Sequence, residues 1–519
     1  MRRRKFIQTF GITPFIGNLK FSDPANHNPK SLTAIHAITS DEPKPHDFFY
    51  KPTTGWAADF IPLYTKGKFE LFYLLDFRDS EKHGEGTPWY RITTNDFVNY
   101  EENGEAIPRG TKDDQDLFIF TGSAIEANGK YHIFYTGHNH HFANQGKPMQ
   151  AVMHAVSEDL KKWTKIPEHT FYAPEDKYEK HDWRDPFVFW NNETKEYNML
   201  LAARFKEGVS RRRGLTALCT SKDLIKWETK APFYAPNLYF THECPDIFKM
   251  RDWWYLVFSE FTDKVKTRYV MSKSLKGPWI IPEVDDFDSH AFYAAKTASD
   301  GTKRFLFGWN PTRGEDSDNG GWQWGGNLVV HEIYPDANGH LLARAPQPVR
   351  DAFKYDLKPG FKVITGNAIA NDAIVKMKAA GSFAAALAQE TPKLGRITAH
   401  CKFKKGAKEF GIMFYATDDL EKSYYIRVEP AANRVVFDRW PRVRAEVPHM
   451  AEFERPLKIS DKNEVALELF VEGTKGVLYV DDKVAMNFRA YDFKEGKWGL
   501  FATDADVEFV VSVSEASGS

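Results

Sequence analysis

A short signature that returns four times along the chain constrains its fold more than any other feature. Each copy opens with Ser or Thr, has an apolar residue three positions later and closes with an aromatic residue. Successive copies begin 63, 64 and 51 residues apart, so each copy marks one unit of similar length. The copies lie at residues 94–100, 157–163, 221–227 and, in a looser form, 272–279.

Two strand-like runs joined by a turn precede each copy of the signature. The run at 124–135 is an example, and its Asn128-Gly129 step is a good hairpin signal. The same pattern returns at 291–309, which gives five units of about 50–60 residues. Units of this length, rich in aromatic and β-branched residues, predict a five-bladed β-propeller over residues 45–342. An array of β-sandwiches or barrels with similar turn spacing is the alternative.

The pattern changes after Leu342. Proline and glycine become frequent there and predict a connector at residues 343–365. Short alternating runs follow, such as 396–403 and 410–415, and they predict a β-sandwich domain over residues 366–516. The sequence therefore predicts an all-β protein, a five-bladed β-propeller followed by a C-terminal β-sandwich.

Composition excludes several classes of partner. The 70 Lys and Arg residues balance 71 Asp and Glu residues, so the formal net charge is -1. Such a chain has no long-range attraction for nucleic acid or an acidic membrane, whereas a neutral sugar meets no electrostatic barrier. The 3 cysteines are widely spaced, which excludes a disulfide-dense scaffold and a CxxC metal or redox motif. We therefore expect a carbohydrate partner, no nucleic acid, no membrane and no cofactor.

The first residues have the order of an export signal. Positive charges from Arg2 to Lys5 precede a moderately apolar run that ends near Phe21, and small residues follow around Ala25. The Arg-Arg-Lys-Phe-Ile segment resembles the twin-arginine type. We therefore expect residues 1–25 to direct the chain to the periplasm or out of the cell, the alternative being a basic tail.

Three of the expected inner strands carry a carboxylate near their start. The innermost strand of each blade faces the propeller axis, so side chains from several blades can meet in one funnel. Asp59 lies in the first unit, Asp185 in the third and Glu243 in the fourth. They are 126 and 58 positions apart, so only the propeller geometry brings them together. Capping of a local turn is the structural alternative for these carboxylates.

The motifs around these carboxylates resemble those of glycoside hydrolase family 32, the family of invertases, inulinases and levanases. The resemblance covers most of the chain and implies a five-bladed propeller followed by a β-sandwich. It implies that Asp59 is the nucleophile, Glu243 the general acid and base, and Asp185 the group that stabilises positive charge on the sugar in the transition state. The residues that carry it are Arg184-Asp185-Pro186, Glu243-Cys244-Pro245-Asp246, Thr121-Gly122-Ser123 and the segment Asp286 to Ala294.

The implied reaction is the cleavage of a furanoside, above all a β-fructofuranoside such as a fructan or fructooligosaccharide, by a retaining double displacement. That mechanism needs two carboxyl groups about 5–5.5 Å apart. One attacks the anomeric carbon, and the other protonates the leaving oxygen and then activates water. Arg184 is expected to hydrogen-bond sugar hydroxyls and to offset part of the local negative charge.

The neighbours of Asp59 depart from the family pattern. The family has Trp-Met-Asn-Asp-Pro-Asn-Gly where this chain has Trp56-Ala-Ala-Asp-Phe-Ile-Pro62. Ala58 lacks the amide that would contact a sugar hydroxyl or orient Asp59, and Phe60 is bulkier than the family's proline. We therefore expect altered substrate recognition and do not assume sucrose.

The other substrate contacts are expected around the funnel, where tryptophan faces stack on sugars and polar groups bind hydroxyls. The loop at 137–141 reads Gly-His-Asn-His-His, but no carboxylate or cysteine follows at ligand spacing, so we expect no metal. The expected substrate-binding residues are Trp56, Ser123, Arg184, Cys244 and Trp322.

Two other functions stay open at this point. A family 43 type arabinofuranosidase or xylosidase shares the propeller but inverts configuration, with carboxyl groups about 6.5–9.5 Å apart. A non-catalytic carbohydrate-binding propeller, which kept the funnel but lost turnover, would fit the altered neighbours of Asp59. Arg184 and Cys244 favour family 32 over family 43.

Overall fold

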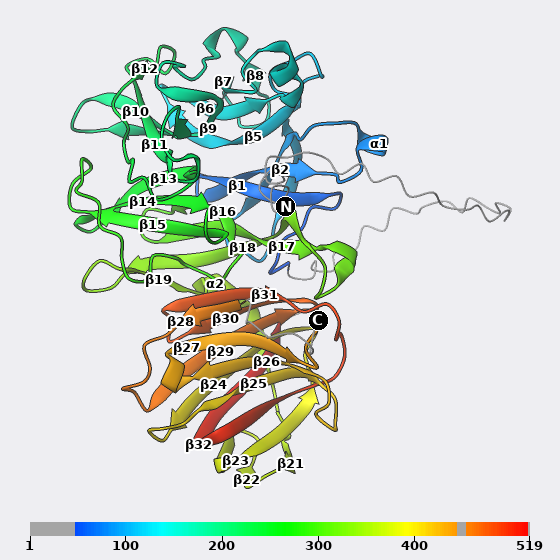
Figure 1. The fold of residues 1–519 in the computed structure, drawn as a ribbon. Helices are drawn as coiled ribbons and strands as arrows, with labels where there is room; N and C mark the ends of the chain where they lie inside the picture. Colours follow the sequence, from blue (N-terminus) through cyan, green and yellow to red (C-terminus); the bar gives the residue numbers. More distant parts are fainter. Residues whose placement is uncertain (1–46, 444–452, 517–519) are drawn as a thin grey trace, which may run out of the picture. The chain divides into compact units, whose positions relative to one another are not determined.

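A computed structural model describes residues 47–443 and 453–516 (Figure 1). The predicted export signal at 1–25 lies outside these residues. Within the described ranges, no helix has the length and apolarity needed to span a membrane. Strands account for most of the described fold, and the helices are short. The helices are α1 (Ser80–His83), α2 (Gln347–Ala352), and the 3-10 turns η1 (His140–Gln145), η2 (Pro167–His169), η3 (Ser210–Arg212), η4 (Gly314–Asp316) and η5 (Pro430–Ala432).

Five antiparallel units, drawn from blue to green in Figure 1, form the N-terminal part of the described chain. In each unit, consecutive strands pair with one another. Their strands are β1 (Trp56–Thr65), β2 (Lys68–Asp76), β3 (Trp89–Thr94) and β4 (Glu101–Ile107); β5 (Phe118–Ala127), β6 (Lys130–His138), β7 (Gln150–Ser157) and β8 (Thr164–Lys165); β9 (Tyr178–Asn191), β10 (Glu196–Phe205), β11 (Gly214–Ser221) and β12 (Glu228–Thr229); β13 (Glu243–Met250), β14 (Trp253–Glu260) and β15 (Lys266–Ser272); β16 (Tyr293–Ser299), β17 (Arg304–Arg313), β18 (Trp322–Pro335) and β19 (Leu341–Arg344).

The first strands of these units contact one another in a closed ring. The order around the ring is β1, β5, β9, β13, β16 and back to β1. Such a ring places the first strand of every unit at a common axis, as in a propeller. The predicted five-bladed β-propeller is confirmed, and side chains of these five inner strands can converge on the axis.

The recurring signature forms the turn after the third strand of a blade. In the third blade, the hydroxyl of Ser221 accepts the backbone N–H of Leu224 at 3.0 Å. The carboxylate of Asp223 accepts the N–H groups of the next two residues after Leu224, each at 2.9 Å. Leu224 has a left-handed φ of 64°, and its side chain is buried between the second and third blades. The opening Ser and the apolar residue of the signature thus each have a local role in the turn.

The C-terminal part, drawn from yellow to red in Figure 1, is the predicted β-sandwich. The long last strand belongs to both layers, because its first half pairs with β25 and its second half with β24. Side chains of the two layers, such as Ile412 and Leu469, share one buried core. The strands are β20 (Phe353–Leu357), β21 (Lys362–Thr365), β22 (Ala368–Ala370), β23 (Ile374–Glu390), β24 (Leu394–Phe403), β25 (Glu409–Ala416), β26 (Ser423–Glu429), β27 (Arg434–Trp440), β28 (Phe453–Pro456), β29 (Glu464–Glu472), β30 (Lys475–Val480), β31 (Val484–Arg489) and β32 (Lys497–Ala516).

The segment 343–365, expected as a connector, contains regular structure. It includes α2, β20 and β21, and it begins within β19. β20 pairs with β32, and β21 pairs with β23, so both strands extend the sheet of the sandwich.

Candidate active site

All five inner strands carry a β-bulge. At this point the pairing of each inner strand with its neighbour shifts register. A bulge adds one residue to a strand and re-aims its side chains, and bulges are frequent next to active sites. The residues at the five bulges are Asp59, Thr121, Asp185, Cys244 and Ala294.

Four of these bulge residues have a strained backbone. Their φ angles are 47° for Asp59, 59° for Asp185, 52° for Cys244 and 51° for Ala294. Residues other than glycine rarely adopt such left-handed angles, and the strain concentrates at functional sites. The repetition around the ring shows that the propeller holds this conformation at the same level of the axis in four blades.

Two hydrogen bonds, one to each oxygen, fix the orientation of the Asp59 carboxylate. The hydroxyl of Thr121 donates to Oδ2 at 2.5 Å, and the indole Nε1 of Trp309 donates to Oδ1 at 3.1 Å. Burial raises the pKa of Asp59 to about 7; the Thr121 bond opposes this rise, and the charges of Asp185 and Glu243 add to it. The three predicted carboxylates therefore lie within electrostatic reach of one another, as the sequence argument requires.

Glu243 accepts one hydrogen bond on each carboxylate oxygen. The guanidinium of Arg184 donates to Oε1 at 2.8 Å, and the hydroxyl of Tyr293 donates to Oε2 at 2.5 Å. Arg184 is buried, and it also contacts Asp182 and the hydroxyl of Thr241. One cation is thus shared between carboxylates that would otherwise repel one another.

Asp185 is held by hydrogen bonds to residues of the two blades on either side of it. Its Oδ2 atom accepts the N–H of Cys244 at 2.9 Å, and its own N–H donates to the hydroxyl of Thr136 at 2.7 Å. The Cys244 thiol lies 3.7 Å from the same carboxylate oxygen. Burial raises the pKa of Asp185 to about 6, an effect that Arg184 opposes and Glu243 reinforces. The Cys244 bulge therefore frees a backbone N–H to bind Asp185.

Three predicted sugar-binding residues have other partners in the structure. The cationic groups of Lys51 and Arg78 lie over the ring of Trp56, 4.6 and 4.7 Å from its centroid. The hydroxyl of Ser123 accepts the N–H of Val188 at 3.0 Å. Trp322 packs against Arg313 and against Phe453 of the sandwich. Their role in substrate binding stays a prediction.

Sequence reasoning missed three residues that hold the carboxylates. Thr121 belongs to the Thr121-Gly122-Ser123 motif, in which Ser123 is the residue predicted to bind substrate. Tyr293 stands in the quoted segment that opens the fifth blade. Trp309 belongs to β17 and has no local signal, because only the ring closure between blades one and five brings it to Asp59.

The altered neighbours of Asp59 point into the protein. Ala58 and Phe60 are both fully buried, and the ring of Phe60 packs against Tyr73 at 5.6 Å between centroids. Phe60 therefore fills the core of the first blade. Ala58 packs near Gly325 of β18.

Comparisons with known proteins identify the family of the chain. A model of the family described as "Glycosyl hydrolases family 32 N-terminal domain" matches residues 49–341. The chain is 26% identical over 484 residues to the beta-fructofuranosidase, insoluble isoenzyme CWINV1, of Arabidopsis thaliana, covering 80% of this chain and 79% of that protein.

Two solved structures show a similar fold. The sucrose-6-phosphate hydrolase from Lactobacillus gasseri has a TM-score of 0.70 at 17% identity, covering 91% of this chain and 93% of that chain. The fructan 1-exohydrolase IIa from Cichorium intybus has a TM-score of 0.69 at 16% identity, covering 91% and 96%. At such identities the agreement concerns the fold.

Proposed function

The chain belongs to glycosyl hydrolase family 32, and from this premise we propose that its propeller cleaves β-fructofuranosides by a retaining double displacement through Asp59, Glu243 and Asp185. The protein is a glycoside hydrolase. The observation that supports the proposed mechanism most strongly is the meeting of three carboxylates from three separate blades around one axis. Asp59 and Asp185 lie at strained bulges, and Glu243 lies directly before one. A structural role would not require three charges to approach one another in a buried place.

In the first step, a carboxylate oxygen of Asp59 attacks the anomeric carbon of the fructosyl unit. Glu243 gives its proton to the leaving oxygen, so that the glycosidic bond breaks as the Asp59–fructosyl ester forms. The bonds from Thr121 and Trp309 hold both oxygens of Asp59 and so fix the direction of attack. Asp185 stabilises the positive charge that develops on the sugar ring.

In the second step, Glu243 takes a proton from water, and the water oxygen displaces Asp59 from the anomeric carbon. Two inversions give net retention of configuration. Tyr293 and Arg184 position Glu243 from two sides, which keeps it at one place while it acts first as acid and then as base. A sugar hydroxyl in place of water would give transfer of the fructosyl unit.

The raised pKa of Asp59 predicts the acidic limb of the pH profile. Asp59 must be ionised to attack, so kcat/KM is expected to fall as the pH drops below about 7. Thr121→Val removes a hydrogen bond that lowers this pKa, and we expect it to move the limb to higher pH by about 1 unit. Steady-state kinetics between pH 5 and pH 9 (roughly two units either side of the limb) measure the shift.

Ser123→Ala is the matched control for this experiment. Its hydroxyl lies on the same strand, β5, but accepts from the Val188 backbone and not from the Asp59 carboxylate. The limb of this variant is expected to coincide with that of the wild type. A limb that stays in place in Thr121→Val, or that moves equally in both variants, contradicts the assignment of the limb to Asp59.

The proposed substrates are fructans or fructooligosaccharides. The support is that relatives bear the names fructan 6-exohydrolase and levanbiose-producing levanase. Purified protein incubated with inulin, levan, sucrose and pentofuranosides, with products separated by chromatography, tests this directly. Fructose or a small fructooligosaccharide is expected; release of arabinose or xylose alone, or no release at all, contradicts the proposal.

We also propose that the chain is exported. The support is the order of charge and apolarity in residues 1–25. Cell fractionation followed by N-terminal sequencing of the native protein tests it, and a cytoplasmic protein that still begins at Met1 would exclude export.

A further inference from the structure

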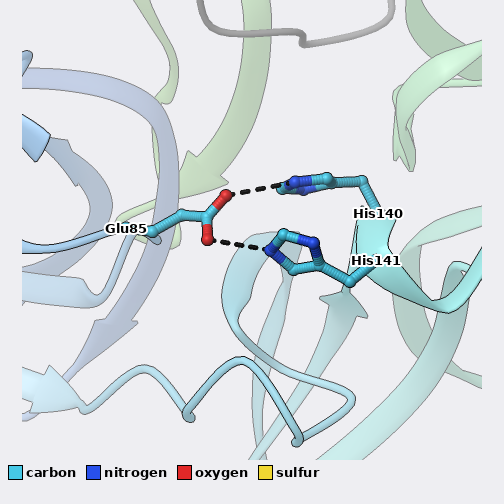
Figure 2. A group of neighbouring side chains, drawn as sticks. All are labelled: Glu85, His140 and His141. Carbon is cyan, nitrogen blue, oxygen red and sulfur yellow. Dashed lines mark hydrogen bonds and ion pairs between the residues drawn. The ribbon is translucent and has the colours of Figure 1, made fainter.

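Two histidines and a glutamate bring their ligand atoms together outside the carboxylate cluster (Figure 2). Nε2 of His140 lies 3.1 Å from one carboxylate oxygen of Glu85, and Nε2 of His141 lies 2.9 Å from the other. The three ligand atoms all lie within 4.8 Å of one another. No carboxylate follows these histidines at ligand spacing in the sequence, which argues against a metal. The fold nevertheless supplies a carboxylate from Glu85, which precedes His140 by 55 residues.

The loop that carries Glu85 is fixed by one arginine. The guanidinium of Arg109 donates to the carbonyl oxygens of His83 and, at 2.7 Å, of Gly86, which flank Glu85 on both sides. Gly86 has a φ of 102°, and a Cβ atom there would lie 2.0 Å from the carbonyl oxygen of Leu117. The backbone on either side of Glu85 is therefore held in one conformation before any ligand arrives.

The two histidines are fixed by a buried cap. They open the 3-10 turn η1, and the side chain of Asn139 accepts the N–H of His141 at 3.0 Å. The amide of Asn139 is fully buried and donates to the carbonyl oxygens of Lys112 and Asp114 at 2.9 and 2.7 Å. Both halves of the cluster are thus preorganised by residues that do not belong to it.

We propose that Glu85, His140 and His141 form a binding site for a divalent transition-metal ion such as Zn²⁺. Zinc binds imidazole nitrogen and carboxylate oxygen at about 2.0–2.2 Å, so ligands around a tetrahedral ion lie about 3.3–3.5 Å apart. The two histidine–carboxylate separations, 2.9 and 3.1 Å, are slightly shorter than this, and the three ligand atoms all lie within 4.8 Å of one another, so adjustments of the side chains would admit the ion. Two imidazoles with one carboxylate favour Zn²⁺, Fe²⁺, Ni²⁺ or Cu²⁺ over the oxygen-binding Mg²⁺ and Ca²⁺.

The ion has a path of entry and an open coordination position. The side chains of His140, His141 and Glu85 are 29%, 43% and 34% exposed, so a fourth position is accessible to water. A series of ring contacts leads from the site toward Thr121. The ring of His140 is 6.4 Å from that of His138, which stacks at 4.5 Å on Phe120, the residue before Thr121. A bound ion would tie the β2–β3 loop of the first blade to the β6–β7 loop of the second.

Calorimetric titration of the full chain with ZnCl₂ tests the proposal without reference to catalysis. The protein carries no histidine tag and is first freed of metal with a chelator. One ion per chain is expected, together with a Tm that rises with Zn²⁺ concentration because the ion binds only the folded state. Glu85→Gln and His141→Ala are each expected to weaken binding at least tenfold, roughly the smallest loss caused by removing even an outer partner of a metal ligand.

His400→Ala is the matched control. His400 also faces a glutamate, Glu464, at 3.8 Å, but within residues 47–443 and 453–516 this pair does not belong to a group of three metal-binding side chains. The variant is expected to bind Zn²⁺ as the wild type does. Three results would overturn the proposal: no binding by the wild type, binding unchanged in both Glu85→Gln and His141→Ala, or equal binding of Mg²⁺. Because the readouts are binding and Tm, a failure here leaves the fructoside assignment untouched, and the reverse also holds.

Discussion

Replacing Asp59 by Asn is expected to lower the turnover of a β-fructofuranoside by at least about 10³-fold, which corresponds to about 4 kcal/mol of transition-state stabilisation. The amide has nearly the same shape as the carboxylate but cannot form the covalent ester. The amide oxygen accepts a hydrogen bond from Trp309, as the carboxylate does. The NH₂ group donates to the Thr121 hydroxyl, which changes from donor to acceptor. The loss therefore reflects missing chemistry, and initial rates with saturating substrate measure it.

The same substitution is expected to stabilise the folded protein at pH 8. The folded-state pKa of Asp59 is about 7 and the unfolded value is 3.8, because burial and neighbouring charges oppose ionisation. The native state therefore loses stability relative to the unfolded state as the pH rises from 3.8 through 7, by up to about 4 kcal/mol. The neutral amide of the Asp59→Asn variant would carry no such penalty, so the Tm of the variant exceeds that of the wild type at pH 8, and the difference vanishes near pH 4.

Asp223→Asn provides the matched control for both effects. Asp223 caps an exposed turn in the third blade, and backbone hydrogen bonds from Lys226 and Ile225 lower its pKa. Turnover by this variant is expected to equal that of the wild type, and its Tm at pH 8 is not expected to rise. Turnover retained by Asp59→Asn, or a Tm at pH 8 no higher than that of the wild type, would contradict the account of Asp59.

Glu243→Gln is expected to lower turnover of a natural fructoside by about 10²–10⁴-fold, because a glutamine neither protonates the leaving oxygen nor activates water. The loss should depend on the substrate. Fluoride leaves without protonation and azide attacks without a base, so β-fructofuranosyl fluoride with added azide bypasses both functions of Glu243. We expect this combination to restore turnover to the variant and to yield fructosyl azide, measured by chromatography.

The exposed Glu228→Gln in β12 controls for the loss of a carboxylate elsewhere in the propeller, and its turnover is expected to be unchanged. Two results would exclude Glu243 as the acid and base. One is that β-fructofuranosyl fluoride with azide does not raise the turnover of Glu243→Gln. The other is that this variant cleaves a natural fructoside at the wild-type rate.

The fold was predictable because the repeat has a local cause. In the turns at 157–163 and 221–227, a Ser hydroxyl and an Asp carboxylate accept nearby N–H groups, and a leucine enters the core. These requirements leave a visible pattern in the sequence. The same holds for the hairpin at Asn128-Gly129, where both residues have positive φ between β5 and β6. Local conformation of this kind can be inferred from a few adjacent residues.

The contacts of the site depend on the whole ring, and most of them were not predictable. Trp309 reaches Asp59 from 250 residues away, and Tyr293 reaches Glu243 from the next blade. The direction of Phe60 also follows from the bulge at Asp59, because one added residue decides whether a side chain faces the axis or the core. The contact of Glu85 with His140 and His141 was not predictable for the same reason. It joins neighbouring blades, and no ligand spacing in the sequence indicates it.

The identity of the residue that becomes bonded to the sugar is the most direct test of the account. Glu243→Gln incubated with β-fructofuranosyl fluoride, without azide, is expected to accumulate the fructosyl ester, because the first step needs no acid and the second lacks its base. Mass spectrometry of the digested protein should then place one fructosyl unit on the peptide that contains Asp59. A fructosyl unit on any other residue, or products of inverted configuration with no labelled peptide, would contradict the proposed mechanism.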